Sequence, residues 1–555
     1  MSQANKPGTF APLHHTVFRR MWFASLFSNL GLFIMGVGAA WDMTQMTNSA
    51  TMVALVQTAL MLPVALFSVA SGALADMFDR RKVAIAALSL SIAGAAALTL
   101  AAHAGQIGPW QLLFWCFVVG SGTALLWPAW GASVNEQVPA EILPAAVALN
   151  GISYNVARSF GPAIGGVIVA AAGGVAAFAI AVIFYTPLLV VLNLWKRTSE
   201  PSRLPPETLG RAMISGYRYV SNAPPIRMVI VRTLIIGLTG GSVSALLPLI
   251  ARDLLGGGAQ LFGLLLGAFG IGSIVGALNV GRIRAKYSGE VCARLCSLGM
   301  GLSVVIIALS RTSIVTAIAL LTFGAAWTAC MMVFNVSVQL SAPRWAAART
   351  LASYQAAVAA GIALAGWGWG AFANTQGVSL ALLTSAATLV ASPLLGRWFR
   401  VPVVGENASG AADALADPEL LLALTARSGP IVLEIEYRIE PQKARLFYAV
   451  MQQVRSTRLR NGAYGWSIAR DIADPELWTE RYHCPTWHDY LRQRNRATQT
   501  ERDLHMRAIE FHKGPEPVRI RRMLERPIGS VRWKDTTPDP GSKVTETLTS
   551  QIGGP

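Results

Sequence analysis

The chain has 555 residues, of which 53% are hydrophobic and only 14% are charged, whereas about a quarter of the residues in an average soluble domain are charged. Residues 1–400 hold 24 Lys and Arg against 9 Asp and Glu, and the remaining residues hold 22 against 20. The net charge of +17 therefore belongs almost entirely to the apolar part of the chain. A nucleic-acid-binding protein would carry its basic residues on a soluble face, so the composition excludes that class and favours a protein embedded in the lipid bilayer.

Twelve apolar stretches in the first 400 residues are long enough to cross a bilayer, which takes about 20 residues of helix. The first follows Arg19 and Arg20 and is too long for the apolar region of a signal peptide, so we expect it to remain as a span. The predicted spans are 20–43, 50–75, 83–103, 111–134, 145–171, 174–195, 228–251, 260–281, 292–310, 313–337, 350–372 and 377–398.

Basic residues in the short loops predict the orientation of these spans. Alternate loops contain clusters such as Arg80, Arg81 and Lys82, whereas the opposite loops contain only Arg252 and Arg311. Cytoplasmic loops carry the excess of Lys and Arg. We therefore predict a multi-pass membrane protein with both termini in the cytoplasm.

The two halves of the membrane part repeat each other. A shift of 204 residues places Gly72 on Gly276. The same shift, without a gap, places Gly120 on Gly324. Two like-oriented halves imply a pseudo-two-fold axis along the membrane normal, with the substrate site between them. The predicted parts are an N-terminal six-helix half over 1–195, a cytoplasmic bridge over 196–227 and a C-terminal six-helix half over 228–400.

The loop between the second and third spans reads GALADMFDRRK. Gly72 permits close approach of two helices, and Asp76 at a helix end would seek a helix N-terminus or an arginine. The motif resembles the helix 2–3 signature of the major facilitator superfamily, which implies a charge latch that includes Asp76 and closes the cytoplasmic side. A charged loop that only fixes topology is the alternative, and Val280 in the second half makes any latch asymmetric. The candidate latch residues are Gly72, Asp76, Asp79, Arg80, Arg81 and Lys82.

The fifth span carries a glycine-rich motif around a proline, which bends a helix while the glycines allow tight contact. It resembles, in part, the helix 5 pattern of exporters in the superfamily, which implies that the motif prevents leakage of solute through the substrate site. The alternative is that the motif is only a kink that serves helix packing. In the fourth span Cys116 stands where drug exporters have an arginine, so proton exchange through that arginine does not carry over. The motif residues are Gly161, Pro162, Gly165 and Gly166.

Four polar or charged residues are candidates for coupling or substrate contact, because charge inside a membrane usually faces a cavity or a partner. Asp42 lies near the end of the first span, where it is either a proton or cation site or a solvated helix end. Arg158 has Asn155 beside it. In a functional role, Arg158 would anchor the substrate or serve as the internal counter-charge of Asp42. In a structural role, it would pair with an acid such as Glu136. Glu136 is the next acid after Asp42 to consider for coupling.

Residues 430–534 form a separate domain after a linker over 401–429, with a flexible tail over 535–555. Alternating apolar residues predict a strand from 431 to 439. A helix with the stripe Leu446, Phe447, Val450, Met451 and Val454 follows Pro441. Two short strands, a helix over 487–511 and a strand over 518–525 complete a β-α-β-β-α-β order, which indicates an α+β ferredoxin-like unit. It resembles the small dimeric domains of antibiotic-biosynthesis monooxygenase type, which implies dimerisation.

Residues 15–400 are similar to the branch of the superfamily that contains the enterobactin exporter and macrolide efflux proteins. The resemblance implies an all-α membrane protein of the bacterial inner membrane: a proton-driven exporter of an amphipathic organic solute, siderophore-like or drug-like, working by alternating access. The alternative is a membrane-tethered enzyme or regulator acting through the C-terminal domain. We expect no cofactor and no metal, and no Walker-type loop occurs in the sequence.

Overall fold

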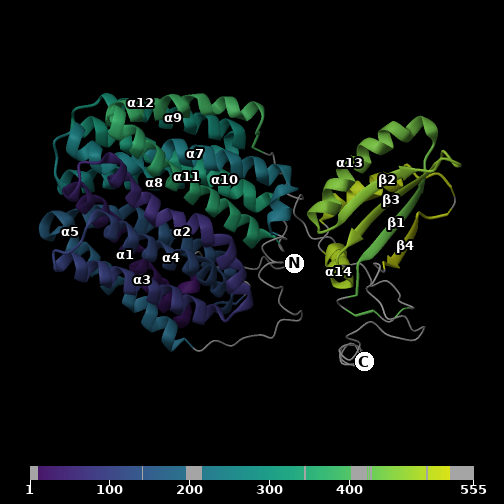
Figure 1. Ribbon diagram of the computed structural model, residues 1–555, viewed down its shortest axis with the longest axis horizontal. Helices are drawn as coiled ribbons and strands as arrows, with labels where there is room; N and C mark the ends of the chain where they lie inside the picture. The colour runs from purple at the N-terminus through teal and green to yellow at the C-terminus, as the bar shows by residue number, and fades with distance from the viewer. Residues whose placement is uncertain are drawn as a thin grey trace. The chain divides into compact units, whose positions relative to one another are not determined.

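The structure is a computed structural model that describes residues 10–139, 142–195, 216–342, 346–401, 422, 424–425, 428–495, 498–514 and 516–525. The chain forms two compact units (Figure 1). The first, called the helical unit here, contains residues 1–213, 228–338 and 351–403. The second, called the C-terminal unit, contains residues 214–227, 339–350 and 404–555.

The helical unit is a bundle of long apolar helices joined by short turns. In the described part of the chain, 11 helices are long and apolar enough to cross a membrane. The long helices are α1 (Thr16–Met46), α2 (Ala50–Met77), α3 (Arg80–His103), α4 (Pro109–Ser133), α5 (Leu143–Leu194), α7 (Pro224–Leu249), α8 (Ala259–Lys286), α9 (Gly289–Leu309), α10 (Ser313–Ser341), α11 (Ala347–Gln376) and α12 (Val378–Ala391). The short turns are η1 (Ala11–His14), η2 (Val134–Glu136), η3 (Ile250–Leu254) and η4 (Ser392–Arg397).

Helix α5 contains two of the predicted spans, 145–171 and 174–195. Its 52 residues would extend about 78 Å at about 1.5 Å per residue, far beyond the roughly 30 Å of a bilayer's apolar core. Gly173 interrupts the helix with φ 77° and ψ 176°, a conformation that a residue with a side chain rarely adopts. The eleven helices therefore provide the twelve predicted spans.

The two arms of α5 both pack along α1, in opposite directions. Contacts of the first arm advance together along both helices: Trp22 Nε1 to Leu149 O at 2.8 Å, and Ser25 Oγ to Ser153 Oγ at 3.5 Å. Contacts of the second arm run the other way: Asp42 with Gly174, and the ring of Phe27 with that of Phe184 at 5.3 Å. Gly173 therefore joins two antiparallel spans.

One pair of equivalent glycines lies at a close contact between equivalent helices in the two halves. Gly120 of α4 lies against the Leu60 carbonyl of α2, where a Cβ atom would collide. Gly324 of α10, its equivalent under the shift of 204, lies in the same way against the Phe269 carbonyl of α8. At this pair the repeat in the sequence corresponds to the same helix contact in both halves, whereas Gly72 makes no close contact and Gly276 lies against the Ala325 carbonyl.

Among the described residues, α2 with α11 and the first arm of α5 with α8 are two of the helix pairs that join the halves. We call the end of the bundle where α1 meets α2 the Thr47 end, and the end where α2 meets α3 the Asp79 end. Towards the Thr47 end, α2 and α11 are linked by Thr58 Oγ1, which donates to Ala363 O at 2.7 Å, and by Ala50 N, which donates to Asn374 Oδ1 at 3.2 Å. The first arm of α5 packs against α8, with Gly166 facing Gly263 and Ser159 facing Gly270.

The C-terminal unit contains a four-stranded antiparallel sheet in the order β2-β3-β1-β4. Its strands are β1 (Ile431–Arg438), β2 (Tyr464–Arg470), β3 (Leu477–Cys484) and β4 (Arg519–Leu524). Its helices are α13 (Ala444–Arg460), which follows the turn η5 (Pro441–Lys443), α14 (Trp487–Asn495) and α15 (Gln499–Ile509). The β-α-β-β-α-β order agrees with the prediction, with the second helix in two pieces.

Two details of this unit were predicted wrongly. The helix expected over 487–511 ends at Asn495 and restarts at Gln499, because Thr498 accepts from the Glu501 N–H and Glu501 accepts from the Thr498 N–H. The core of α13 contains Phe447, whereas Leu446 is 64% exposed and does not belong to the apolar stripe.

Several predicted parts lie wholly or partly outside the described residues. These are residues 196–215 of the predicted bridge, most of the linker over 401–429, the end of the domain predicted over 430–534, and the tail over 535–555.

Candidate functional site

The helix 2–3 motif forms the junction between α2 and α3 at the Asp79 end. Asp79 is the N-cap of α3, and its carboxylate accepts from the backbone N–H groups of Arg81 (2.9 Å) and Lys82 (3.3 Å). Asp76 lies in the last turn of α2, and its side chain is outside the described part of the structure. Gly72 does not provide the predicted close approach, because a Cβ atom there would meet no described atom within 4 Å.

The arginines of the motif tie the start of α3 to its neighbours in the first half. Arg80 forms an ion pair with Glu136 of η2 at 3.0 Å. Arg81 donates to the carbonyls of Leu192 (2.8 Å) and Asn193 (2.6 Å), where the last turn of α5 has unpaired acceptors. Glu136 therefore pairs with Arg80, and the alternative in which it pairs with Arg158 is wrong.

The glycines of the helix 5 motif lie at close helix contacts, as predicted. Gly161 and Gly165 face α1, where added Cβ atoms would lie 2.8 Å from Phe33 Cβ and 3.1 Å from Ile34 Cα. Gly166 faces α8 and the second half. The backbone of α5 stays helical at Pro162. Within Leu143–Leu194, non-helical backbone angles occur at Gly173 instead.

Asp42 lies at the Thr47 end, beside the bend of α5. The backbone N–H of Gly174 donates to its carboxylate, and any side chain at position 174 would collide with both carboxylate oxygens. Two residues further along α1, the Thr44 carbonyl accepts from Arg252 of the second half at 2.7 Å. Asp42 therefore lies close to a contact between the halves.

Arg158 lies midway along the first arm of α5, about 22 Å from both Leu143 and Gly173 at about 1.5 Å per residue. Its guanidinium lies over the ring of Phe269 on α8, 5.9 Å from the centroid. A charge at this depth costs about 2.5–3.5 kcal/mol on insertion scales, and an exposed cation–π contact returns about 0.5–1 kcal/mol. Asn155 is not part of this contact, because its amide donates to Gly151 O at 2.9 Å.

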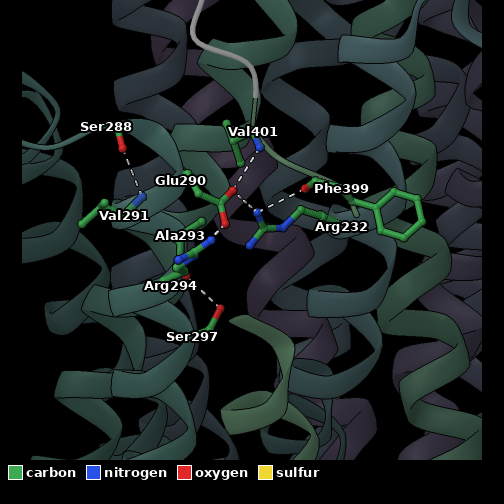
Figure 2. A network of polar contacts seen from close by, with 9 residues as sticks. All are labelled: Arg232, Ser288, Glu290, Val291, Ala293, Arg294, Ser297, Phe399 and Val401. Carbon is green, nitrogen blue, oxygen red and sulfur yellow. Dashed lines mark hydrogen bonds and ion pairs between the residues drawn. The ribbon is translucent and has the colours of Figure 1, made fainter. Parts of the chain in front are cut away.

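A buried charge network that the sequence did not predict lies at the Asp79 end of the second half (Figure 2). Arg232 of α7 is 1% exposed and forms an ion pair with Glu290 of α9. Glu290 also accepts from Arg294 (2.8 Å) and from the backbone N–H of Val401 (3.0 Å), and Arg232 donates to Phe399 O (3.4 Å). The network therefore fixes the end of the membrane part to α7 and α9.

The C-terminal unit holds a second buried ion pair. Glu480 of β3 is fully buried and accepts from Arg458 (3.1 Å), Trp466 (3.0 Å) and Tyr437 (3.2 Å). Burial raises the pKa of Glu480, but the charge and hydrogen bonds of Arg458 together with the hydrogen bond of Trp466 hold the pKa below its ordinary value. Burial, followed by the charge of Arg458, lowers the pKa of His505 to about 4. Both carboxylate oxygens of Glu480 accept hydrogen bonds from other side chains of the domain. We therefore assign this cluster a structural role in the C-terminal unit.

Comparison with known proteins assigns the geometry to a class. The family model described as "Transmembrane secretion effector" matches residues 7–528. The chain is 26% identical over 265 residues to the staphyloferrin A transporter of Staphylococcus aureus (strain NCTC 8325 / PS 47). The match covers 47% of this chain and 66% of the relative, so this chain spans slightly less than two thirds of that relative's length. It is 28% identical over 323 residues to the enterobactin exporter EntS of Escherichia coli O1:K1 / APEC, covering 56% of this chain and 74% of the relative.

Solved structures of transporters share the fold. A bacterial homologue of the human lysosomal transporter Spinster matches with a TM-score of 0.53 at 14% identity, over 69% of this chain and 97% of that one. The nucleoside transporter NupG matches with a TM-score of 0.53 at 11% identity, over 69% and 99%. The chain therefore has the fold of a multi-pass membrane transporter, and its relatives are transporters rather than enzymes.

Proposed function

Because the chain belongs to the transmembrane secretion effector family of the major facilitator superfamily, we propose that it is a proton-driven exporter of an amphipathic organic solute. The solute is of siderophore or drug type, like those named for the enterobactin and staphyloferrin relatives. It leaves the bacterial cytoplasm as the two six-helix halves rock against each other around a site between them.

The observation that carries this proposal is the contact of α5 with α8. These helices belong to different halves, and their backbones meet at Gly166 and Gly263 without an intervening side chain. Helices that meet through small residues bring their backbones into close approach, and such a contact can serve as the pivot between two halves. This contact therefore supports a rocking motion of the halves.

For orientation, we propose that the Asp79 end faces the cytoplasm. It carries Arg80, Arg81 and Lys82, and the positive-inside rule supports this placement. Asp42 at the opposite end would then take up a proton from the periplasm, and Asp76 would close the cytoplasmic side. The C-terminal unit would regulate the transporter or dimerise it.

Comparison of cells with and without the protein tests the function. With a proton gradient imposed, cells that lack the protein should retain an organic solute that cells with the protein release. A protonophore should abolish the difference, because outward movement against the concentration gradient requires proton entry. Equal intracellular solute profiles in both strains would contradict export, and release that survives the protonophore would contradict proton coupling.

A further inference from the structure

Two hydrogen-bond donors without acceptors share one face of α5. Tyr154 and Arg158 are one helical turn apart, so their side chains lie on the same side of the helix. Among the described residues both side chains contact aromatic rings, and neither the hydroxyl nor the guanidinium has a hydrogen bond or an ion pair there. Both side chains are half-buried, and polar groups withdrawn from bulk water usually have a hydrogen-bond partner. These two donors therefore lack an acceptor among the residues that the structure describes.

Aromatic rings from both halves surround the donors. The Tyr154 ring packs at 5.7 Å from Phe33 of α1 and at 5.6 Å, edge to face, from Trp127 of α4. The Arg158 guanidinium lies over Phe269, which belongs to α8 in the second half. Small-molecule sites are typically lined by apolar and aromatic side chains with a few convergent polar groups, and this arrangement has both.

The acids of the first half that the structure describes are engaged elsewhere. Glu136 pairs with Arg80 and Asp79 caps α3 at the Asp79 end, and Asp42 accepts from the Gly174 N–H at the Thr47 end. The positive charge of Arg158 is consequently not neutralised by any of the three. An anion brought in by a ligand would neutralise it.

We propose that Tyr154 and Arg158 bind an anionic group, such as a carboxylate, of a transported solute that carries an aromatic ring beside that group. The guanidinium offers paired N–H groups in the geometry that a carboxylate accepts, and the Tyr154 hydroxyl donates a third bond. The solute ring packs among Trp127, Phe33 and Phe269. This site rests on the proposed function in that the solute is the exported cargo.

The location of the site connects binding to transport. Tyr154 and Arg158 belong to the first half, whereas Phe269 belongs to the second half. Movement of α5 against α8 changes the distance between the donors and that ring. The affinity for the solute therefore differs between the two arrangements of the halves, as alternating access requires.

Direct binding to the purified full-length protein tests the site without any transport step. The probe is 2-naphthoate, measured by equilibrium dialysis against its neutral analogue 2-naphthylmethanol. We expect the wild type to prefer the anion, and Arg158→Gln to weaken naphthoate binding by about 10- to 100-fold, the effect of one charged hydrogen-bond partner. Naphthylmethanol binding should stay unchanged in this variant, which also shows that the variant is folded.

Two further variants keep the test sharp. Arg158→Lys retains the charge without the paired geometry, so its naphthoate affinity should lie between those of the wild type and Arg158→Gln. Arg311→Gln removes an arginine whose guanidinium bonds to the carbonyls of Ala308 and Ser310 outside the site, and it should bind naphthoate as the wild type does.

The outcomes separate this site from the proposed function. Equal affinity of the wild type for the anion and the alcohol, or wild-type naphthoate affinity in Arg158→Gln, overturns the site even if export is observed. Arg158-dependent naphthoate binding by a protein that exports nothing supports the site and overturns the exporter.

Discussion

Gly166 of α5 and Gly263 of α8 lie backbone to backbone across the boundary between the halves. A Cβ atom at Gly166 would lie 3.0 Å from the Gly263 nitrogen and closer still to its Cα atom. We expect Gly166→Ala to lower the free energy of unfolding by about 1–3 kcal/mol, because overpacked contacts cost that much. Transport should slow as well, because the added methyl group moves the halves apart. Thermal unfolding in detergent and transport in vesicles measure the two effects.

Gly151→Ala on the same helix is the matched control. A Cβ atom at Gly151 meets nothing within 4 Å, and alanine favours helix over glycine by about 1 kcal/mol. This variant should be as stable as the wild type or more so. If Gly166→Ala and Gly151→Ala had the same stability and transport rate, the contact of α5 with α8 would tolerate an added methyl group, against our prediction.

Asp76 and Asp79 should respond differently to the same substitution. Asp76→Asn is expected to reduce transport at least about 10-fold with insertion intact, because a latch loses its charge; a charged partner is worth about 1.5–3 kcal/mol. Asp79→Asn should have little effect, because asparagine caps a helix about as well as aspartate. Transport by membranes with matched protein levels is the measurement, and normal transport by Asp76→Asn would remove the latch.

Asp42→Asn should separate uphill from downhill transport. Asparagine can still accept the Gly174 N–H, so the local structure should persist, but it cannot carry a proton. We expect loss of proton-driven accumulation in inverted vesicles with retention of downhill exchange. Asp253→Asn is the control, because Asp253 pairs with its neighbour Arg252 at 2.6 Å and is 39% exposed. Retained uphill transport in Asp42→Asn would assign coupling elsewhere, with Glu136 next.

The C-terminal unit should lose stability as the pH falls below 6.5, the ordinary pKa of His505. The unfolded chain takes up a proton there, whereas the folded chain does so only near pH 4. The free energy of unfolding should therefore fall by about 1.6 kcal/mol between pH 6.5 and pH 5. Amide hydrogen exchange of peptides from β1 and β3, corrected for the intrinsic rate, measures this loss. His505→Gln should reduce the dependence of this stability on pH. An unchanged pH dependence in His505→Gln would contradict the assignment to His505.

A chain that ends at residue 403 should still insert and move solute. Both halves and the contacts of Phe399 and Val401 with Arg232 and Glu290 are kept. A chain that ends at residue 396 lacks those contacts, which should cost about 1–3 kcal/mol of stability because Glu290 loses a donor. Size-exclusion profiles and transport rates compare the two truncations. Inactivity of the longer truncation would show that the C-terminal unit is required for transport.

Features that depend on local sequence were predictable, and those that depend on distant partners were not. Apolar length and loop charge indicated the spans, and the shift of 204 indicated the repeat. The break before α15 was missed although Thr498 and Glu501 form a capping pattern. Glu290 is one of only two acids in residues 228–400, a signal that could have marked it. Its partner Arg232 lies 58 residues away, and no local pattern joins them.

The bend at Gly173 has a consequence for how the protein enters the membrane. The two arms of α5 have no hydrophilic loop between them. No polar segment therefore has to cross the bilayer after the first arm has inserted. We expect the arms to enter together as a hairpin during synthesis. A short epitope inserted between Gly173 and Gly174 would displace the Asp42 contact and force the arms to enter one after the other. Biogenesis at this point therefore depends on one glycine rather than on a loop.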